Sequence, residues 1–268
     1  PSQRGRAYRK RSSQVVFRAA SPFLYLEDLV DKRGLPEPQG TLFFPSHSTH
    51  WVTAVSEFDA LADRLAALPE RFHPISVCVY WRDFLLGHHD AFVRRGFRIV
   101  SAGHMYDSNF LFRLYYLCRL HRYAASNELG SHLFYTVKAG CSYFHLASET
   151  KYVHEAARGE DIARIPVEIR AKFESMFSEP KDELSPEEIG VIDEYTGADQ
   201  KMSPATMREF FSFCETIDRF GTAVWNERRH WMFPRSLKRA FWHKPRAAAG
   251  RAVCFALRAL SHGPVKSN

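Results

Sequence analysis

The chain has 268 residues, of which 45% are hydrophobic and 14% aromatic, and its formal net charge is +7. A chain of this size and composition can bury a substantial core. Neither a run of about twenty apolar residues nor the apolar stretch of a secretory signal appears, so the sequence predicts no membrane-spanning helix and no signal peptide.

The basic residues gather towards the two ends of the chain. Residues 1–39 form a basic N-terminal segment that precedes the first predicted strand.

The five cysteines are widely spaced, without a CxxC pair, which predicts reduced thiols rather than disulfides or a zinc site. No GxGxxG, P-loop or Gly-X-Ser-X-Gly motif supports a dinucleotide, ATPase or serine-hydrolase function.

Five short runs between residues 40 and 147 are apolar, or built of small residues, along nearly their whole length. Segments with helical spacing separate them, as near residues 56–68 and 108–120, where apolar side chains recur on one helical face. Such strands are typical of a parallel sheet covered on both faces. The alternation predicts an α/β fold, a doubly wound, Rossmann-like parallel sheet with additional C-terminal helices. The predicted strands are Thr41–Phe44, Ile75–Tyr80, Arg98–Ser101, Tyr123–Ser126 and Cys141–Leu146.

The chain beyond the sheet divides into three further segments. Ser185-Pro186 and Ser203-Pro204 predict two helix starts, because Ser is favoured at the N-cap and Pro at the first helical position. The segments are a polar, partly helical excursion at 148–184, closing helices at 185–221 and a basic, aromatic tail at 222–268.

Polar side chains follow four of the predicted strands, at the edge of the sheet where α/β proteins bind ligands. Their chemistry suits an anion: Gly130 lets a phosphate approach the backbone, the next residues offer the free N–H groups of a helix start, and Arg82 supplies a fork of donors. The alternative is that the Ser and Asn side chains are plain N-caps and that each histidine is structural. The candidate binding residues are Ser46, His47, Ser48, Arg82, His104, Asn127, Gly130, Ser131 and His132.

Three motifs resemble one known family. They are Phe-Pro-Ser-His-Ser from Phe44, Gly-His-Met-Tyr-Asp-Ser-Asn-Phe-Leu from Gly103, and Ser-Asn-Glu-Leu-Gly-Ser-His-Leu-Phe-Tyr from Ser126. Together they look like the nucleotide-sugar-binding half of bacterial GT-B glycosyltransferases, which build surface polysaccharides such as capsule and lipopolysaccharide. In that family two Rossmann-like halves face each other across a cleft, and the C-terminal half binds the donor.

The resemblance implies a transferase that passes a sugar from a nucleotide-sugar donor to a surface polysaccharide or lipid-linked acceptor. The donor is the substrate, and no separate cofactor is expected. Without an Asp-X-Asp motif, we expect no metal site. The implied donor contacts are Ser46, His47, Ser48, His104, Asn127, Gly130, Ser131 and His132.

The resemblance leaves the catalytic residues open. Family members usually carry an acceptor domain before the donor half, and that domain commonly supplies the base, whereas here about forty residues precede the first strand. We expect that the acceptor domain is missing from this chain. The alternative function is a non-catalytic module that binds a nucleotide or glycan, or docks on a membrane.

The tail at 222–268 carries many Lys and Arg residues, interleaved with Trp and Phe, against the single acid Glu227. This pattern predicts binding to an anionic membrane surface, although a solvated basic tail has the same composition. Nucleic acid is a less favoured partner, since no RNA-binding signature accompanies the basic residues. We expect a cytoplasmic protein that can associate peripherally with the inner membrane.

Overall fold

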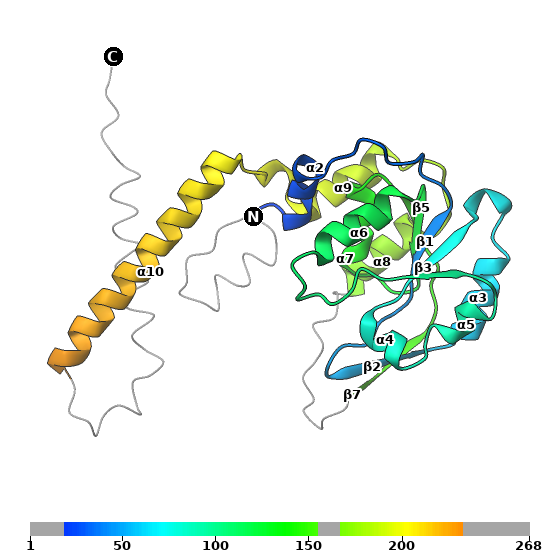
Figure 1. The fold of residues 1–268 in the computed structure, drawn as a ribbon, viewed down its shortest axis with the longest axis horizontal. Coiled ribbons are helices and arrows are strands. Elements are labelled where there is room, and N and C mark those ends of the chain that lie inside the picture. The colour runs from blue at the N-terminus through cyan, green and yellow to red at the C-terminus, as the bar shows by residue number, and fades with distance from the viewer. Residues whose placement is uncertain (1–18, 155–166, 233–268) are drawn as a thin grey trace, which may run out of the picture. The chain divides into compact units, whose positions relative to one another are not determined.

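A computed structural model describes residues 19–154 and 167–232 of the chain (Figure 1). The chain divides into two compact units, and one of them spans Ser21–Asp199. The other unit includes the 29-residue helix α10 (Pro204–Met232).

The larger unit is built on five parallel strands in the order β4-β3-β1-β5-β6. The chain runs outward from β1 to β3 and β4, returns to the other side of β1, and runs outward again through β5 and β6. The order therefore reverses between β1 and β5, the point where open α/β sheets bind their ligands. The predicted α/β parallel sheet is confirmed, with some strand ends up to two residues shorter. The strands are β1 (Thr41–Phe44), β3 (Ile75–Cys78), β4 (Arg98–Val100), β5 (Tyr123–Ser126) and β6 (Ser142–His145).

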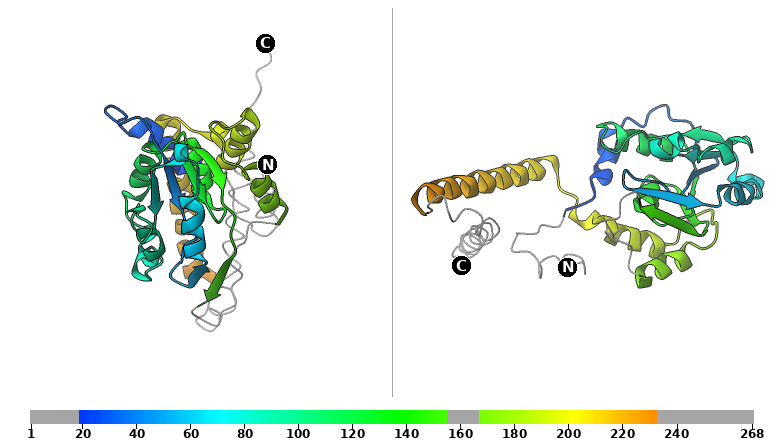
Figure 2. Two further views of the ribbon diagram at one scale, coloured as in Figure 1. Left: turned by 90° about the vertical axis from the view of Figure 1, so that its right-hand side faces the viewer. Right: turned by 90° about the horizontal axis from the view of Figure 1, so that it is seen from below.

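Helices flank the sheet on both sides (Figure 2). Side chains alternate along β1, because successive residues of a strand point to opposite faces. Leu42 and Phe44 belong to one buried apolar cluster and Phe43 to the other. Both faces of this strand are therefore dry, which explains its uninterrupted apolar sequence. The helices between strands are α3 (Phe58–Ala66), α4 (Trp81–Leu85), α5 (Asp90–Val93), α6 (Phe110–Arg119) and α7 (Ser131–Lys138), with a 3₁₀ turn at Glu70–Phe72 (η2).

Residues on either side of the predicted domain at 40–147 complete its core. The Phe23 ring stacks on the Tyr135 ring, with centroids 4.5 Å apart, so part of the predicted N-terminal segment 1–39 is packed against α7. Phe173 and Ile192 are buried in the same cluster. The elements concerned are η1 (Pro22–Tyr25), α2 (Leu26–Leu29), α8 (Val167–Met176), α9 (Pro186–Thr196) and η3 (Ala198–Gln200).

A second, two-stranded sheet was not expected from the sequence. Strand β2 (Val52–Ser56) pairs antiparallel with β7 (Thr150–His154), and Ser56 lies opposite Thr150. The predicted helix near 56–68 consequently begins only at Phe58. The two strands are far apart in the sequence, so no local sequence pattern predicts their pairing.

Helix α10 begins at Pro204, as predicted, and the Thr206 N–H donates to Ser203 Oγ at 3.1 Å. The expected tail at 222–268 is described only as the backbone of α10 up to Met232, and its remainder lies outside the described residues, as do residues 1–18 and 155–166. Within the described ranges, no helix is both long enough and apolar enough to cross a bilayer.

Candidate functional site

The loops that follow β1 and β5 meet at the reversal point of the sheet. The Ser46 N–H donates to Asn127 Oδ1 at 2.7 Å, across 81 positions of sequence. All four predicted loops lie at the carboxyl ends of their strands, because the five strands are parallel. The predicted binding residues are therefore gathered at one edge of the sheet.

Asn127 is the centre of a buried polar network. Its side-chain amide donates to Ser148 Oγ at 3.0 Å and to Thr150 Oγ1 at 3.3 Å. The Ser56 hydroxyl lies 2.9 Å from Ser46 Oγ and 2.7 Å from Thr150 Oγ1. Ser46 and Asn127 are each only 2% exposed. These two predicted binding residues therefore hold the loops and the small sheet in place from within.

Ser48 is also buried, and its partner is a carboxylate. The Ser48 N–H lies 3.0 Å from both oxygens of Asp83, and His88 Nδ1 lies 3.0 Å from Asp83 Oδ1. Ser48 Oγ accepts the Ala54 N–H at 3.0 Å. Buried carboxylates need such donors, so Asp83 ties the loop after β1 to α4. No sequence motif pointed to this role for Asp83.

His132 folds back over the turn that precedes its own helix. Its Nε2 lies 3.0 Å from the Glu128 carbonyl oxygen, and its ring stacks on Phe44 with centroids 5.2 Å apart. A Cβ atom at Gly130 would lie 2.9 Å from His132 Cε1, so glycine makes room for the imidazole. Burial, reinforced by the nearby His47, lowers the pKa of His132 to about 3. The ring is therefore neutral and donates to the carbonyl.

The outward-facing part of the edge is formed by other predicted residues. Helix α7 begins at Ser131, as predicted, with Gly130 at the N-cap, and Ser131 is exposed. His47 is exposed as well, whereas Arg82 and His104 are partly buried. A helix start carries unpaired N–H groups and the positive end of the helix dipole. An anion can thus approach α7 beside Ser131.

Six aromatic and imidazole rings lie together at the carboxyl ends of β1, β3 and β4, and we call them the ring cluster. His104 is close to three of them, with centroids 5.6 Å from His50, 5.3 Å from Trp81 and 5.1 Å from Tyr106. Only two members were among the predicted binding residues. The ring cluster consists of His47, His50, Tyr80, Trp81, His104 and Tyr106.

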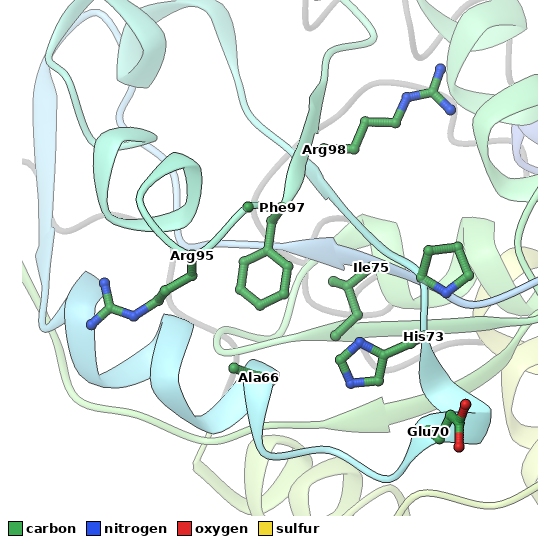
Figure 3. A pocket seen from close by; sticks show the side chains of 9 residues that line it. Ala66, Glu70, His73, Ile75, Arg95, Phe97 and Arg98 are labelled. Carbon is green, nitrogen blue, oxygen red and sulfur yellow. The ribbon is translucent and has the colours of Figure 1, made fainter.

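A hollow of about 570 Å³ lies away from this edge, at the amino ends of β3 and β4 (Figure 3). His73, Ile75 and Phe97 line it, together with two arginines. One of these, Arg95, is already paired with Asp59 at 2.7 Å and with Asp63 at 2.6 Å. Because ligands of open α/β sheets bind at the carboxyl ends, we do not assign the site to this hollow.

A second hollow, of about 400 Å³, lies at the carboxyl ends of β3 and β4 and is predominantly apolar. Trp81 of the ring cluster is one of its lining residues, together with Phe84, Leu85 and Ile99. The volume is within the range of small-ligand pockets. Among the described residues, no group of three or more His, Cys, Asp or Glu side chains is placed to hold a metal ion.

Comparisons with known proteins add no relative to this picture. No protein-family model matches the chain, and neither the curated proteins nor the solved structures contain a match.

Proposed function

We propose that the unit at Ser21–Asp199 is the nucleotide-sugar-binding half of a GT-B type glycosyltransferase. One observation carries the proposal. Two of the motifs that resemble this family, in the loops after β1 and β5, lie side by side where the strand order reverses, joined by the Ser46–Asn127 hydrogen bond of 2.7 Å. That position is where a doubly wound sheet binds a nucleotide.

The chemistry of the two loops supports an anionic ligand. The start of α7 offers backbone N–H groups and a positive dipole end to the donor's phosphate. Asp83 and Asn127 keep the loop after β1 in place through their buried hydrogen bonds. The N–H groups at the start of α7 are likewise held in place by the fold. Fixed donors stabilise an anion more than mobile ones, because they do not reorganise when negative charge develops on the leaving phosphate.

In the proposed reaction, an acceptor hydroxyl oxygen bonds to the anomeric carbon of the donor sugar as the bond from that carbon to the phosphate oxygen breaks. The nucleoside phosphate leaves with the bonding electrons, and the start of α7 stabilises its negative charge. The hydroxyl proton passes to a base, which the acceptor half commonly supplies in the family that the motifs resemble. We assign the donor side of the reaction to this chain.

The experiment is calorimetric titration of the full chain with CMP, CDP, UDP, GDP and dTDP. We expect one nucleotide to bind selectively, and Ser131→Asp to weaken it by about tenfold or more, because the new carboxylate repels phosphate. An acid in the first turn of a helix also favours the helix, so the fold is retained.

Ser131→Asn is the matched control, since it has the same shape without the charge. Its affinity should stay close to that of the wild type. If the wild-type chain binds none of the five nucleotides, the donor-site function is wrong and a docking module becomes the better explanation. Equal nucleotide affinity of the Asp and Asn variants would show that the phosphate does not bind at the start of α7.

A further inference from the structure

The ring cluster is unusual because much of its surface faces solvent. Tyr106 is 79% exposed and His50 is also exposed, while Tyr80, Trp81 and His104 are partly buried. Aromatic side chains stabilise a fold mainly by being buried. Exposed rings that gather at the edge expected to bind ligands therefore point to recognition rather than to stability.

Trp81 adds a second, independent observation. Its indole Nε1 is buried and has no hydrogen-bond partner among the described residues. Buried N–H groups nearly always have an acceptor, so the protein alone does not complete the hydrogen bonding here. The same ring lines the apolar hollow of about 400 Å³.

We propose that the ring cluster binds the base of the nucleotide, by stacking a flat heteroaromatic ring against the side chains of His50, Trp81 and Tyr106. The inference rests on the proposed function and adds the location of the base. Stacking on aromatic rings suits any nucleobase, because every base has a π face. Imidazole and indole nitrogens beside the stack supply polar groups that can meet the edge of the base.

The spacing of the strands supports one ligand that spans both parts of the edge. The ring cluster follows β1, β3 and β4, whereas the anion-binding start of α7 follows β5. Strands β3 and β5 lie on the two sides of β1, so their ends are about 10 Å apart at roughly 4.8 Å per strand. A nucleoside with its phosphate has about this reach, with its base over β3 and its phosphate at α7.

The test uses the full chain and a panel of UMP, CMP, AMP, GMP and dTMP, with inorganic pyrophosphate as a probe that lacks a base. Tyr106→Ala and His50→Ala remove exposed rings and should leave the fold intact. We expect each variant to lower the affinity for the selected nucleotide by about fivefold to a hundredfold, in line with the loss of one stacking contact. Pyrophosphate affinity should not change.

Tyr116→Ala is the matched control, because Tyr116 is 37% exposed on α6 and belongs to no ring pair of the cluster. Unchanged nucleotide affinity in both cluster variants, with affinity lost in Ser131→Asp, would overturn the base location and leave the donor site standing. Equal losses for nucleotide and pyrophosphate would also overturn it. A wild-type chain that binds no nucleotide would overturn both proposals.

Discussion

Gly130 leaves room for the His132 ring, and this contact gives a prediction at the scale of single residues. In Gly130→Ala the new Cβ would lie 2.9 Å from His132 Cε1, closer than real Cβ contacts come, and 3.0 Å from Nδ1. We expect the free energy of unfolding to fall by about 1–3 kcal/mol, as in other overpacked sites. Urea unfolding of both proteins measures the difference.

Two further variants isolate the cause. Gly190 lies in α9 with nothing within 4 Å of a built Cβ, so Gly190→Ala should stabilise the protein by about 0.5–1 kcal/mol. In a His132→Ala background, Gly130→Ala should lose most of its cost, because the clashing ring is absent. A cost that persists in the double variant would contradict the contact.

His132 also predicts a pH dependence. Its pKa is about 3 in the folded protein against an ordinary value of 6.5, so the unfolded chain binds the proton more tightly. The stability from the neutral ring is present above pH 6.5 and is lost as the pH falls towards 3. Each proton of difference changes the free energy of unfolding by about 1.4 kcal/mol per pH unit.

His132→Gln keeps a donor for the Glu128 carbonyl and cannot titrate. Unfolding by urea at pH 7.5, 6.0 and 5.0 should show a shallower loss of stability in this variant than in the wild type. His121 and His145 also have pKa values that burial lowers, so both proteins should lose some stability. If the free energy of unfolding depended on pH equally in the two proteins, the pKa of His132 would not be lowered by folding.

At the scale of elements, α9 depends on a complete capping box. Ser185 Oγ accepts the Glu188 N–H at 3.2 Å, and Glu188 Oε2 accepts the Ser185 N–H at 2.7 Å. Burial opposes the charge of Glu188, but Lys181 and Ser185 hold its pKa below the usual value. Ser185→Ala should lower the free energy of unfolding by about 1 kcal/mol.

Ser203→Ala is a matched control, because it removes the hydroxyl that caps α10 in the other compact unit. Thermal unfolding of the unit at Ser21–Asp199 should be lowered by Ser185→Ala and unaffected by Ser203→Ala. An equal shift in both variants would show that the two units unfold together.

At the scale of the whole molecule, the compact unit predicts an independent domain. A fragment that ends at Asp199 keeps both apolar clusters and all five parallel strands. We expect it to unfold in one cooperative transition and to bind the selected nucleotide as tightly as the full chain. Weaker binding by a fragment that folds would place a ligand contact in residues 200–268.

The tail at 222–268 predicts a separate interaction with lipid. Its basic and aromatic residues should bind vesicles that contain phosphatidylserine and release them as salt is raised, because each basic residue near an anionic surface contributes about 1 kcal/mol. Cosedimentation of the full chain and of a chain ending at Gly221 measures this. Equal binding of neutral vesicles would contradict an electrostatic mechanism.

Features that depend on neighbouring residues could be predicted from the sequence. Short apolar runs such as Thr41–Phe44 predict strands that are buried on both faces, and Ser185-Pro186 predicts the start of α9. The order of these elements was enough to predict the parallel sheet and to bring the loops to one edge, because strands joined through helices run parallel and their carboxyl ends then lie at the same edge. Nine candidate residues could be proposed from this order.

Which of those nine residues face solvent could not be predicted from the sequence, because it depends on contacts between distant segments. Ser46, Ser48 and Asn127 are buried. Strands β2 and β7, whose Ser56 and Thr150 lie 94 positions apart, supply partners of Ser46 and Asn127, and Asp83 supplies the partner of Ser48. Four rings of the cluster were likewise missed, since they come from three separate loops that meet only in the fold. Local sequence specifies the secondary-structure propensity of each segment and the order of the elements. The burial and the partners of a side chain follow from contacts between distant segments.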